Sequence, residues 1–185
     1  MKVQTFDIEG LFLLKPKVFG DDRGYFLESY NKQTLKELTG LALDFVQDNE
    51  SKSSYGVLRG LHFQDPPFAQ TKLVRVIEGK VLDVAVDLRK DASTYGQYQA
   101  VELSAENKHQ FLVPRGFAHG FVVLSKTAVF AYKVDNGYAP NHDNGIIYND
   151  EALGIDWQIP EEDIKLSQKD NQLQTFEMYS KKSVF

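Results

Sequence analysis

The fold class is decided by the stretch Val81-Leu-Asp-Val-Ala-Val-Asp-Leu88. Its even-numbered residues are all aliphatic and share one face, whereas its odd-numbered residues share the other face and include two aspartates. This strict alternation is typical of a β-strand, because side chains in a strand point to opposite faces with a period of two.

Similar short patterns occur on both sides of this strand, at 24–30, 72–78, 98–103, 110–113, 120–124 and 128–134. Turn-forming glycine, proline, asparagine and aspartate separate them. The clearest helix spans 31–39, where Asn31 can cap the start and Gly40 can end it, and a second short helix is expected after Pro160. Many short strands with close turns predict an all-β sandwich or barrel with a few short helices.

Length and composition narrow the class of protein. A chain of 185 residues is long enough to bury the core of one domain, so residues 1–185 are predicted to form a single domain. The net charge of -5 and the lack of a long basic run disfavour nucleic-acid binding, which depends on cationic contacts with phosphate. The chain has no cysteine, which removes disulfides, thiolate metal sites and cysteine nucleophiles from consideration.

The expected location is the cytoplasm. No apolar run approaches the roughly 20 residues that span a bilayer, and Asp7 interrupts the region where a signal peptide would be uniformly apolar. The sequence also lacks a glycine-rich loop of the dinucleotide or P-loop type. We therefore expect no membrane partner and no cofactor bound by those motifs.

Two segments resemble the paired motifs of cupin-type jelly-roll β-barrels. The first is Gly56-Val-Leu-Arg-Gly-Leu-His62-Phe-Gln64 with Lys72 and Gly79, and the second is Pro114-Arg-Gly-Phe-Ala-His119 with Val123. The four positions that usually bind the cupin metal hold His62, Gln64, Lys72 and His119. An ammonium repels a divalent cation and glutamine is a poor ligand beside imidazole, so no metal is predicted.

These residues suit proton transfer beside a ketone instead. Imidazole accepts a proton near neutral pH, and a fixed ammonium stabilises negative charge that develops on an oxygen. Inversion of the carbon also needs an acid on the opposite face. Tyr132 is a candidate acid, because it shares one face of a predicted strand with Ala128, Phe130 and Val134.

A more specific resemblance covers nearly the whole chain. It rests on the stretches Val57-Leu-Arg-Gly-Leu-His62, Lys72-Leu-Val-Arg-Val76, Asp83-Val-Ala-Val-Asp-Leu-Arg89, Val101-Glu-Leu-Ser-Ala-Glu-Asn107, Pro114-Arg-Gly-Phe-Ala-His119-Gly-Phe121 and Tyr132-Lys-Val134. Together they resemble the dTDP-4-dehydrorhamnose 3,5-epimerase family. That family converts dTDP-4-dehydro-6-deoxyglucose to dTDP-4-dehydrorhamnose without a cofactor, in the supply of activated rhamnose for surface polysaccharide.

The resemblance implies a role for each matching residue. It makes His62 the base, oriented by Asp170, Tyr132 the acid and Lys72 the group that stabilises the enolate. It assigns Arg23 and Arg59 to the pyrophosphate, His119 to the substrate pocket, and Tyr138 to a stack on the thymine. Further substrate contacts are implied for Phe26, Glu28, Gln47, Asn49, Asp143 and Lys169.

The resemblance also implies a homodimer that exchanges N-terminal strands, so that Arg23 and Glu28 act in the neighbouring subunit's pocket. Four positions depart from the family pattern. Gly137 replaces a common aromatic residue, Phe63 a common tyrosine, and Asp143-Asn144 a common Glu-Arg pair. These departures concern nucleotide contacts more than the chemistry.

Other interpretations stay open at this stage. A lone histidine or tyrosine is usually structural, Gly20-Asp-Asp-Arg-Gly24 can be a plain hairpin turn, and Asp83 and Asp170 can belong to structural ion pairs. His109 and His142 are expected at the surface. The rival functions are a mono-epimerase or 3,4-ketoisomerase for a related sugar nucleotide, a metal-dependent cupin enzyme, and a non-catalytic sugar-nucleotide binding module.

Overall fold

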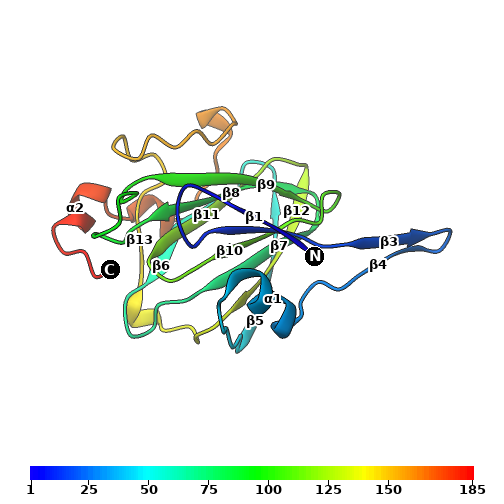
Figure 1. Cartoon of the computed structure of the whole chain (residues 1–185). Helices are drawn as coiled ribbons and strands as arrows, with labels where there is room; N and C mark the ends of the chain where they lie inside the picture. Colours follow the sequence, from blue (N-terminus) through cyan, green and yellow to red (C-terminus); the bar gives the residue numbers. More distant parts are fainter.

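The computed structural model describes residues 1–185 as two antiparallel β-sheets that pack face to face (Figure 1). The larger sheet runs in the order β1 (Lys2–Thr5), β2 (Phe12–Lys15), β10 (Gln110–Val113), β7 (Lys72–Glu78), β12 (Thr127–Val134) and β5 (Gln47–Ser54). The smaller sheet runs β13 (Asp143–Gly145), β6 (Leu58–Gln64), β11 (Phe117–Val123), β8 (Lys80–Asp87) and β9 (Tyr98–Ser104). The predicted all-β, cupin-like architecture is confirmed.

Both faces of β8 are buried, for two different reasons. One face packs into the core between the sheets, through Val81 and Ala85. The other face, which carries Leu82 and Val84, packs under the C-terminal segment, whose Trp157 belongs to the same cluster. The alternation in this stretch therefore separates two apolar environments rather than core from solvent.

Most predicted elements are present, with shifted ends. The strands at 72–78 and 110–113 match β7 and β10, and the predicted strand at 120–124 begins earlier, at Phe117. The expected strand at 24–30 is wrong at its end, because β4 (Gly24–Leu27) stops where its hairpin pairing stops.

The helices also follow the sequence signals. Helix α1 (Lys32–Thr39) is capped by the Asn31 side chain and ends at Gly40, whose φ is 75°. After Pro160 the chain makes only a single 3-10 turn, η2 (Glu161–Asp163). The remaining helical segments are η1 (Pro140–His142), η3 (Asp170–Gln172) and α2 (Phe176–Ser180). No helix has the length and apolarity needed to cross a membrane.

Six strands were not predicted as strands: β1, β2, β3, β5, β6 and β13. The sequence of β5 is Gln-Asp-Asn-Glu-Ser-Lys-Ser-Ser, which has low β propensity and no apolar alternation. It is a strand because all eight residues pair with β12, from Gln47 opposite Val134 to Ser54 opposite Thr127. Tertiary pairing overrides the local preference here.

A two-stranded hairpin, β3 (Val18–Asp21) and β4, extends away from the barrel (Figure 1). Its large apolar side chains are exposed, with Phe19 at 53%, Tyr25 at 61% and Phe26 at 69%. Lys108 reaches this hairpin and donates to the Tyr25 hydroxyl at 3.0 Å. Exposed apolar surface on a projecting arm is typical of a segment that contacts another molecule.

Two glycines allow β6 and β11 to lie unusually close beside the cavity. Gly60 has φ 127°, and a Cβ there would lie 2.6 Å from Gly120 Cα. A Cβ at Gly120 would in turn lie 2.7 Å from the Arg59 carbonyl oxygen. Only glycine satisfies both the positive φ and the close approach, so this pair sets the spacing of the strands that carry His62 and His119.

Candidate active site

A cavity of about 420 Å³ lies between the two sheets. Strands β5, β6, β7, β11 and β12 and the segment 167–170 supply its walls. Eight predicted site residues line it: Asn49, Arg59, His62, Lys72, His119, Tyr132, Lys169 and Asp170. The fold therefore brings side chains from distant parts of the chain to one ligand-sized space.

The His62 imidazole is paired with the Asp170 carboxylate, with Nε2 2.5 Å from Oδ1. The Ser167 hydroxyl donates to the other carboxylate oxygen at 2.7 Å. Burial raises the pKa of Asp170, but the hydrogen bonds from His62 and Ser167 outweigh it and hold this pKa below its usual range. An ionised carboxylate can only accept, so the bonded Nε2 carries the hydrogen and Nδ1 is left to take a proton.

A second imidazole–carboxylate pair lies beside the first. His119 is directly opposite His62 in the β6–β11 ladder, and its Nε2 is 2.8 Å from Asp83 Oδ1. Both side chains are almost fully buried, whereas 30% of the His62 side chain is exposed. The other oxygen of Asp83 has no hydrogen-bond partner. Asp83 is thus half of a buried pair with a histidine that lines the cavity.

Burial perturbs both polar groups that the larger sheet contributes. Desolvation lowers the pKa of the Lys72 ammonium to about 8, although the negative charges of Asp143 and Asp83 partly oppose the shift. Desolvation raises the pKa of the Tyr132 phenol, and Asp143 adds to this while Arg59 opposes it. At neutral pH the cavity therefore holds a cation and a protonated phenol.

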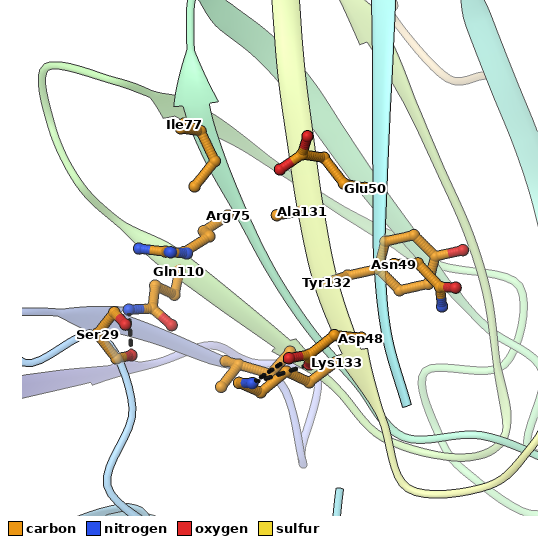
Figure 2. Close-up of a pocket in the computed structure, with 11 residues that line it drawn as sticks. Ser29, Asp48, Asn49, Glu50, Arg75, Ile77, Gln110, Ala131, Tyr132 and Lys133 are labelled. Carbon is orange, nitrogen blue, oxygen red and sulfur yellow. Dashed lines mark hydrogen bonds and ion pairs between the residues drawn. The ribbon is translucent and has the colours of Figure 1, made fainter. Parts of the chain in front are cut away.

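The two sheets place these groups on opposite sides of the cavity. His62 and His119 come from β6 and β11 of the smaller sheet, whereas Lys72 and Tyr132 come from β7 and β12 of the larger sheet. Figure 2 shows Tyr132 and its ladder partner Asn49 on one side of β12 and β5. A planar intermediate held between the sheets would meet the imidazole on one face and the phenol on the other.

Cationic and amide groups extend the cavity wall. Arg59 donates from Nε to the Ser53 hydroxyl at 3.2 Å and takes part in none of the ion pairs of the structure, so its charge is available to an anion. Gln47 lies at the start of β5 and donates to Asn49 Oδ1 at 2.8 Å. Gln47 therefore positions an amide that lines the cavity without lining it itself.

Tyr138 and Asp143 lie next to the cavity rather than in it. The Tyr138 hydroxyl donates to Asp143 Oδ2 at 2.9 Å, and the Lys169 ammonium donates to the same oxygen at 2.5 Å. Lys169 lines the cavity, and 60% of Tyr138 is exposed. These three residues form a rim at the side of the cavity where Asp170 lies.

Three predicted substrate contacts lie away from this cavity. Arg23 and Phe26 belong to the projecting hairpin, where the Arg23 guanidinium pairs with Asp21. Glu28 follows the hairpin and accepts a hydrogen bond from the Asn31 amide at 3.2 Å. None of the three lines the cavity of its own chain.

The cavity also contains residues that the sequence analysis missed. They are Glu50, Ser51, Gly120, Phe121, Phe130 and Ser167. Ser167 had a local signal, because a hydroxyl three residues before Asp170 can bond the carboxylate across one turn. The prediction that His109 and His142 are surface residues is wrong in part, because both are half-buried. Neither lines the cavity.

A second hollow of about 310 Å³, drawn in Figure 2, lies on the larger sheet and shares Asn49, Glu50 and Tyr132 with the cavity between the sheets. Much of its lining is already engaged: Lys133 pairs with Asp48 at 2.8 Å, and Gln110 donates to the Ser29 carbonyl oxygen at 2.7 Å. It contains no imidazole and no imidazole–carboxylate pair. Both imidazole–carboxylate pairs therefore belong to the cavity between the sheets or its wall.

Three of the four residues at the cupin ligand positions make other hydrogen bonds, and the fourth is itself a cation, which is unsuited to bind a metal ion. His62 and His119 each bond a carboxylate, and Lys72 is an ammonium. Both polar atoms of the Gln64 side chain bond to backbone groups. No group of three or more histidine, aspartate or glutamate side chains is arranged to hold a metal ion.

A cupin-like barrel with imidazole, phenol and ammonium groups around one cavity is typical of enzymes that transfer protons on a small ligand. A family model described as dTDP-4-dehydrorhamnose 3,5-epimerase matches residues 5–178. The dTDP-4-dehydrorhamnose 3,5-epimerase of Salmonella typhimurium is 57% identical over 166 residues, which cover 88% of each chain.

Solved structures agree with this match. The crystal structure of dTDP-4-dehydrorhamnose 3,5-epimerase from Elizabethkingia anophelis has a TM-score of 0.93 and 55% identity, covering 99% of this chain and 98% of that one. The dTDP-6-deoxy-D-glucose-3,5-epimerase of Legionella pneumophila, in complex with dTDP-4-keto-L-rhamnose, has a TM-score of 0.94 and 45% identity, covering 99% and 96%. The chain belongs to the dTDP-4-dehydrorhamnose 3,5-epimerase family, and it is an isomerase of the epimerase type.

Proposed function

We propose that the chain converts dTDP-4-dehydro-6-deoxyglucose to dTDP-4-dehydrorhamnose by inverting C3 and C5. The ketone at C4 acidifies both neighbouring carbons, so one base and one acid can serve the two centres in turn. The observation that carries this proposal is the placement of His62 and Tyr132 in one cavity on opposite sheets. A non-catalytic binder would have no use for that arrangement.

In this mechanism His62 removes the proton. Asp170 holds the imidazole through Nε2 and stabilises the imidazolium that forms, and Ser167 fixes the carboxylate in turn. As the proton leaves carbon, negative charge moves to the C4 oxygen. The Lys72 ammonium stabilises this charge, and its effect is strong because the site is desolvated.

Tyr132 returns a proton on the opposite face. Because burial raises its pKa, the phenol stays protonated over the neutral range and is ready to donate. Before the second centre reacts, the phenolate takes a proton from solvent and the His62 imidazolium releases one to solvent, so both groups are reset. Each inversion is therefore a balanced transfer, with one proton taken by imidazole and one supplied by the phenol.

The nucleotide would lie along the rim. Arg59 carries an unengaged guanidinium that can bind a pyrophosphate in a bidentate manner. Tyr138 offers an exposed ring for a base stack, and Asn49, positioned by Gln47, offers an amide to the nucleotide. His119, Asp143 and Lys169 complete the set of substrate contacts.

We also propose a homodimer in which the β3–β4 hairpin reaches the partner's cavity. The hairpin exposes Phe19, Tyr25 and Phe26, and neither Arg23 nor Glu28 lines the cavity between the sheets of its own chain. A second copy of the chain would cover the apolar surface and place the Arg23 guanidinium beside the partner's Arg59.

We place this one-domain enzyme in the cytoplasm, consistent with a chain that has no cysteine.

The reaction is tested by incubating the protein with the 4-keto sugar nucleotide in D₂O and recording proton spectra. We expect deuterium at both C3 and C5 in the inverted product. Exchange at only one carbon would indicate a mono-epimerase, and no exchange would contradict the proposal. Tyr132→Phe is expected to exchange with retention, because His62 can return a deuteron while the opposite face has no acid.

The dimer is tested by mixing two defective subunits. His62→Ala removes the base and Arg23→Ala removes the hairpin cation. If the hairpin serves the partner, a mixed dimer contains one site with both groups intact, so activity should rise well above that of either variant alone. A mixture no more active than its components would show that Arg23 acts within its own chain or not at all.

A further inference from the structure

The Gln64 side chain joins two loops through its backbone contacts. Its Nε2 donates to the Phe68 carbonyl oxygen at 2.7 Å and to the Gly137 carbonyl oxygen at 3.1 Å, and its Oε1 accepts from the Ala139 amide at 2.7 Å. The residue is only 4% exposed. A buried amide that makes three backbone bonds is costly to disturb, because each abandoned group would be left without a partner.

These bonds fix the residues on both sides of Tyr138. Gly137 and Ala139 are its immediate neighbours, and Gln64 bonds to each of them. Other contacts between the same two loops fall outside this pair: Gln70 donates to the Asn136 carbonyl oxygen, and Asn136 donates to the Pro67 carbonyl oxygen. Gln64 is therefore the side chain that restrains the backbone direction of Tyr138.

The restraint continues to the rim of the cavity. The Tyr138 hydroxyl donates to Asp143, which also accepts from Lys169. Asp143 lies opposite Gln64 in the β13–β6 ladder. Gln64 thus holds both partners of the Tyr138–Asp143 hydrogen bond, Tyr138 through its neighbours and Asp143 through the strand ladder. The Tyr138 side chain needs such a restraint because 60% of the residue is exposed.

We infer that Gln64 is a positioning residue for the nucleotide, which holds Tyr138 in the orientation that binds the base of a nucleoside diphosphate. This inference rests on the proposed function. A ring that is already oriented loses less conformational freedom on binding, so the restraint increases affinity without a new contact. At the position where other cupins place a metal ligand, this chain uses an amide to organise its ligand-binding rim.

The test is Gln64→Leu, with the affinity for dTDP measured by calorimetry and kcat and KM measured with the 4-keto sugar nucleotide. Since base–aromatic stacking is worth about tenfold or more in affinity, we expect about tenfold weaker dTDP binding, a similar rise in KM and kcat within about twofold of the wild type. Gln64→Met keeps the length of the side chain and removes all three bonds, so it should give a similar loss and serves if the leucine variant does not fold.

Ser125→Ala is the matched control. The Ser125 hydroxyl also joins two turns through three backbone bonds, to Lys80 N, Lys80 O and Thr127 O, and it lines no part of the cavity. We expect it to lower stability without changing dTDP affinity. Equal weakening of dTDP binding in both variants would mean that Gln64 acts only through general stability.

A double variant identifies the route. In a Tyr138→Ala background, Gln64→Leu should cause no further loss of dTDP affinity, because the ring that it orients is gone. Additive losses, or a single Gln64→Leu variant that binds dTDP like the wild type, would overturn the inference. If the wild type itself neither binds dTDP nor turns over the 4-keto sugar nucleotide, the proposed function fails instead.

Discussion

The two imidazole–carboxylate pairs of the cavity are similar in chemistry and different in burial. His62–Asp170 and His119–Asp83 lie side by side, and the two histidines face each other in one strand ladder. The His62 side chain keeps 30% of its surface exposed, whereas His119 keeps 7% and Asp83 none. The comparison teaches that the two imidazoles are oriented in the same way by a carboxylate and differ in how much surface they present to the cavity, which favours His62 as the proposed base.

The largest expected effect separates the two histidines. His62→Ala should lower kcat by about a hundredfold or more, the usual contribution of a general base. His119→Ala should raise KM more than it lowers kcat, because this imidazole is proposed to contact substrate without taking the proton. Steady-state kinetics of both variants measures this difference. An equal loss of kcat in the two variants would contradict the distinction between His62 as base and His119 as substrate contact.

The carboxylates sharpen the same comparison. Asp170→Asn should lower kcat by about tenfold to a hundredfold, because an amide can present its NH₂ to Nε2 and favour the wrong tautomer. Asp83→Asn should change kcat less, because its histidine is not the base. Turnover of each variant at saturating substrate is the measurement. A larger kcat loss for Asp83→Asn would indicate that His119 takes part in proton transfer.

A substitution at Gly60 should increase the distance between β6 and β11, the strands that carry His62 and His119. Gly60→Ala forces a Cβ within 2.6 Å of Gly120 Cα at a φ of 127°, so the strands must separate. We expect a loss of about 1–3 kcal/mol of unfolding free energy, typical of one residue held in a disallowed conformation. Urea denaturation measures it. Unchanged stability would show that the β6–β11 contact is not as tight as this geometry requires.

Near neutral pH the smallest expected effect is the pH dependence set by Lys72, which lines the same cavity. Its pKa is lowered to about 8, so the ammonium is lost as pH rises through that value, and kcat/KM should fall above about pH 8. Arg59, Lys169, Glu50, Asp170, Asp143 and Asp83 are the other charged groups in or near this space. A profile of kcat/KM that stays level to pH 10 would exclude an essential Lys72 ammonium.

Much of the fold could be predicted because its patterns are local. The alternation over 81–88 predicted β8, and Asn31 and Gly40 predicted the ends of α1, since a cap and a left-handed glycine act within one turn. Strand β5 could not be predicted in this way. Its polar residues become a strand only through pairing with β12, which is a contact between distant parts of the chain.

The sequence by itself determined the chemical inventory: an imidazole and an ammonium at two cupin ligand positions, no cysteine, and motifs specific enough to indicate the family. Only the tertiary structure decided how these groups act. It set Tyr132 across the cavity from His62, buried Asp83 against His119, and used Gln64 to hold the loop of Tyr138. The physical reason is that pKa, access and orientation depend on neighbours from other strands, which no local pattern specifies.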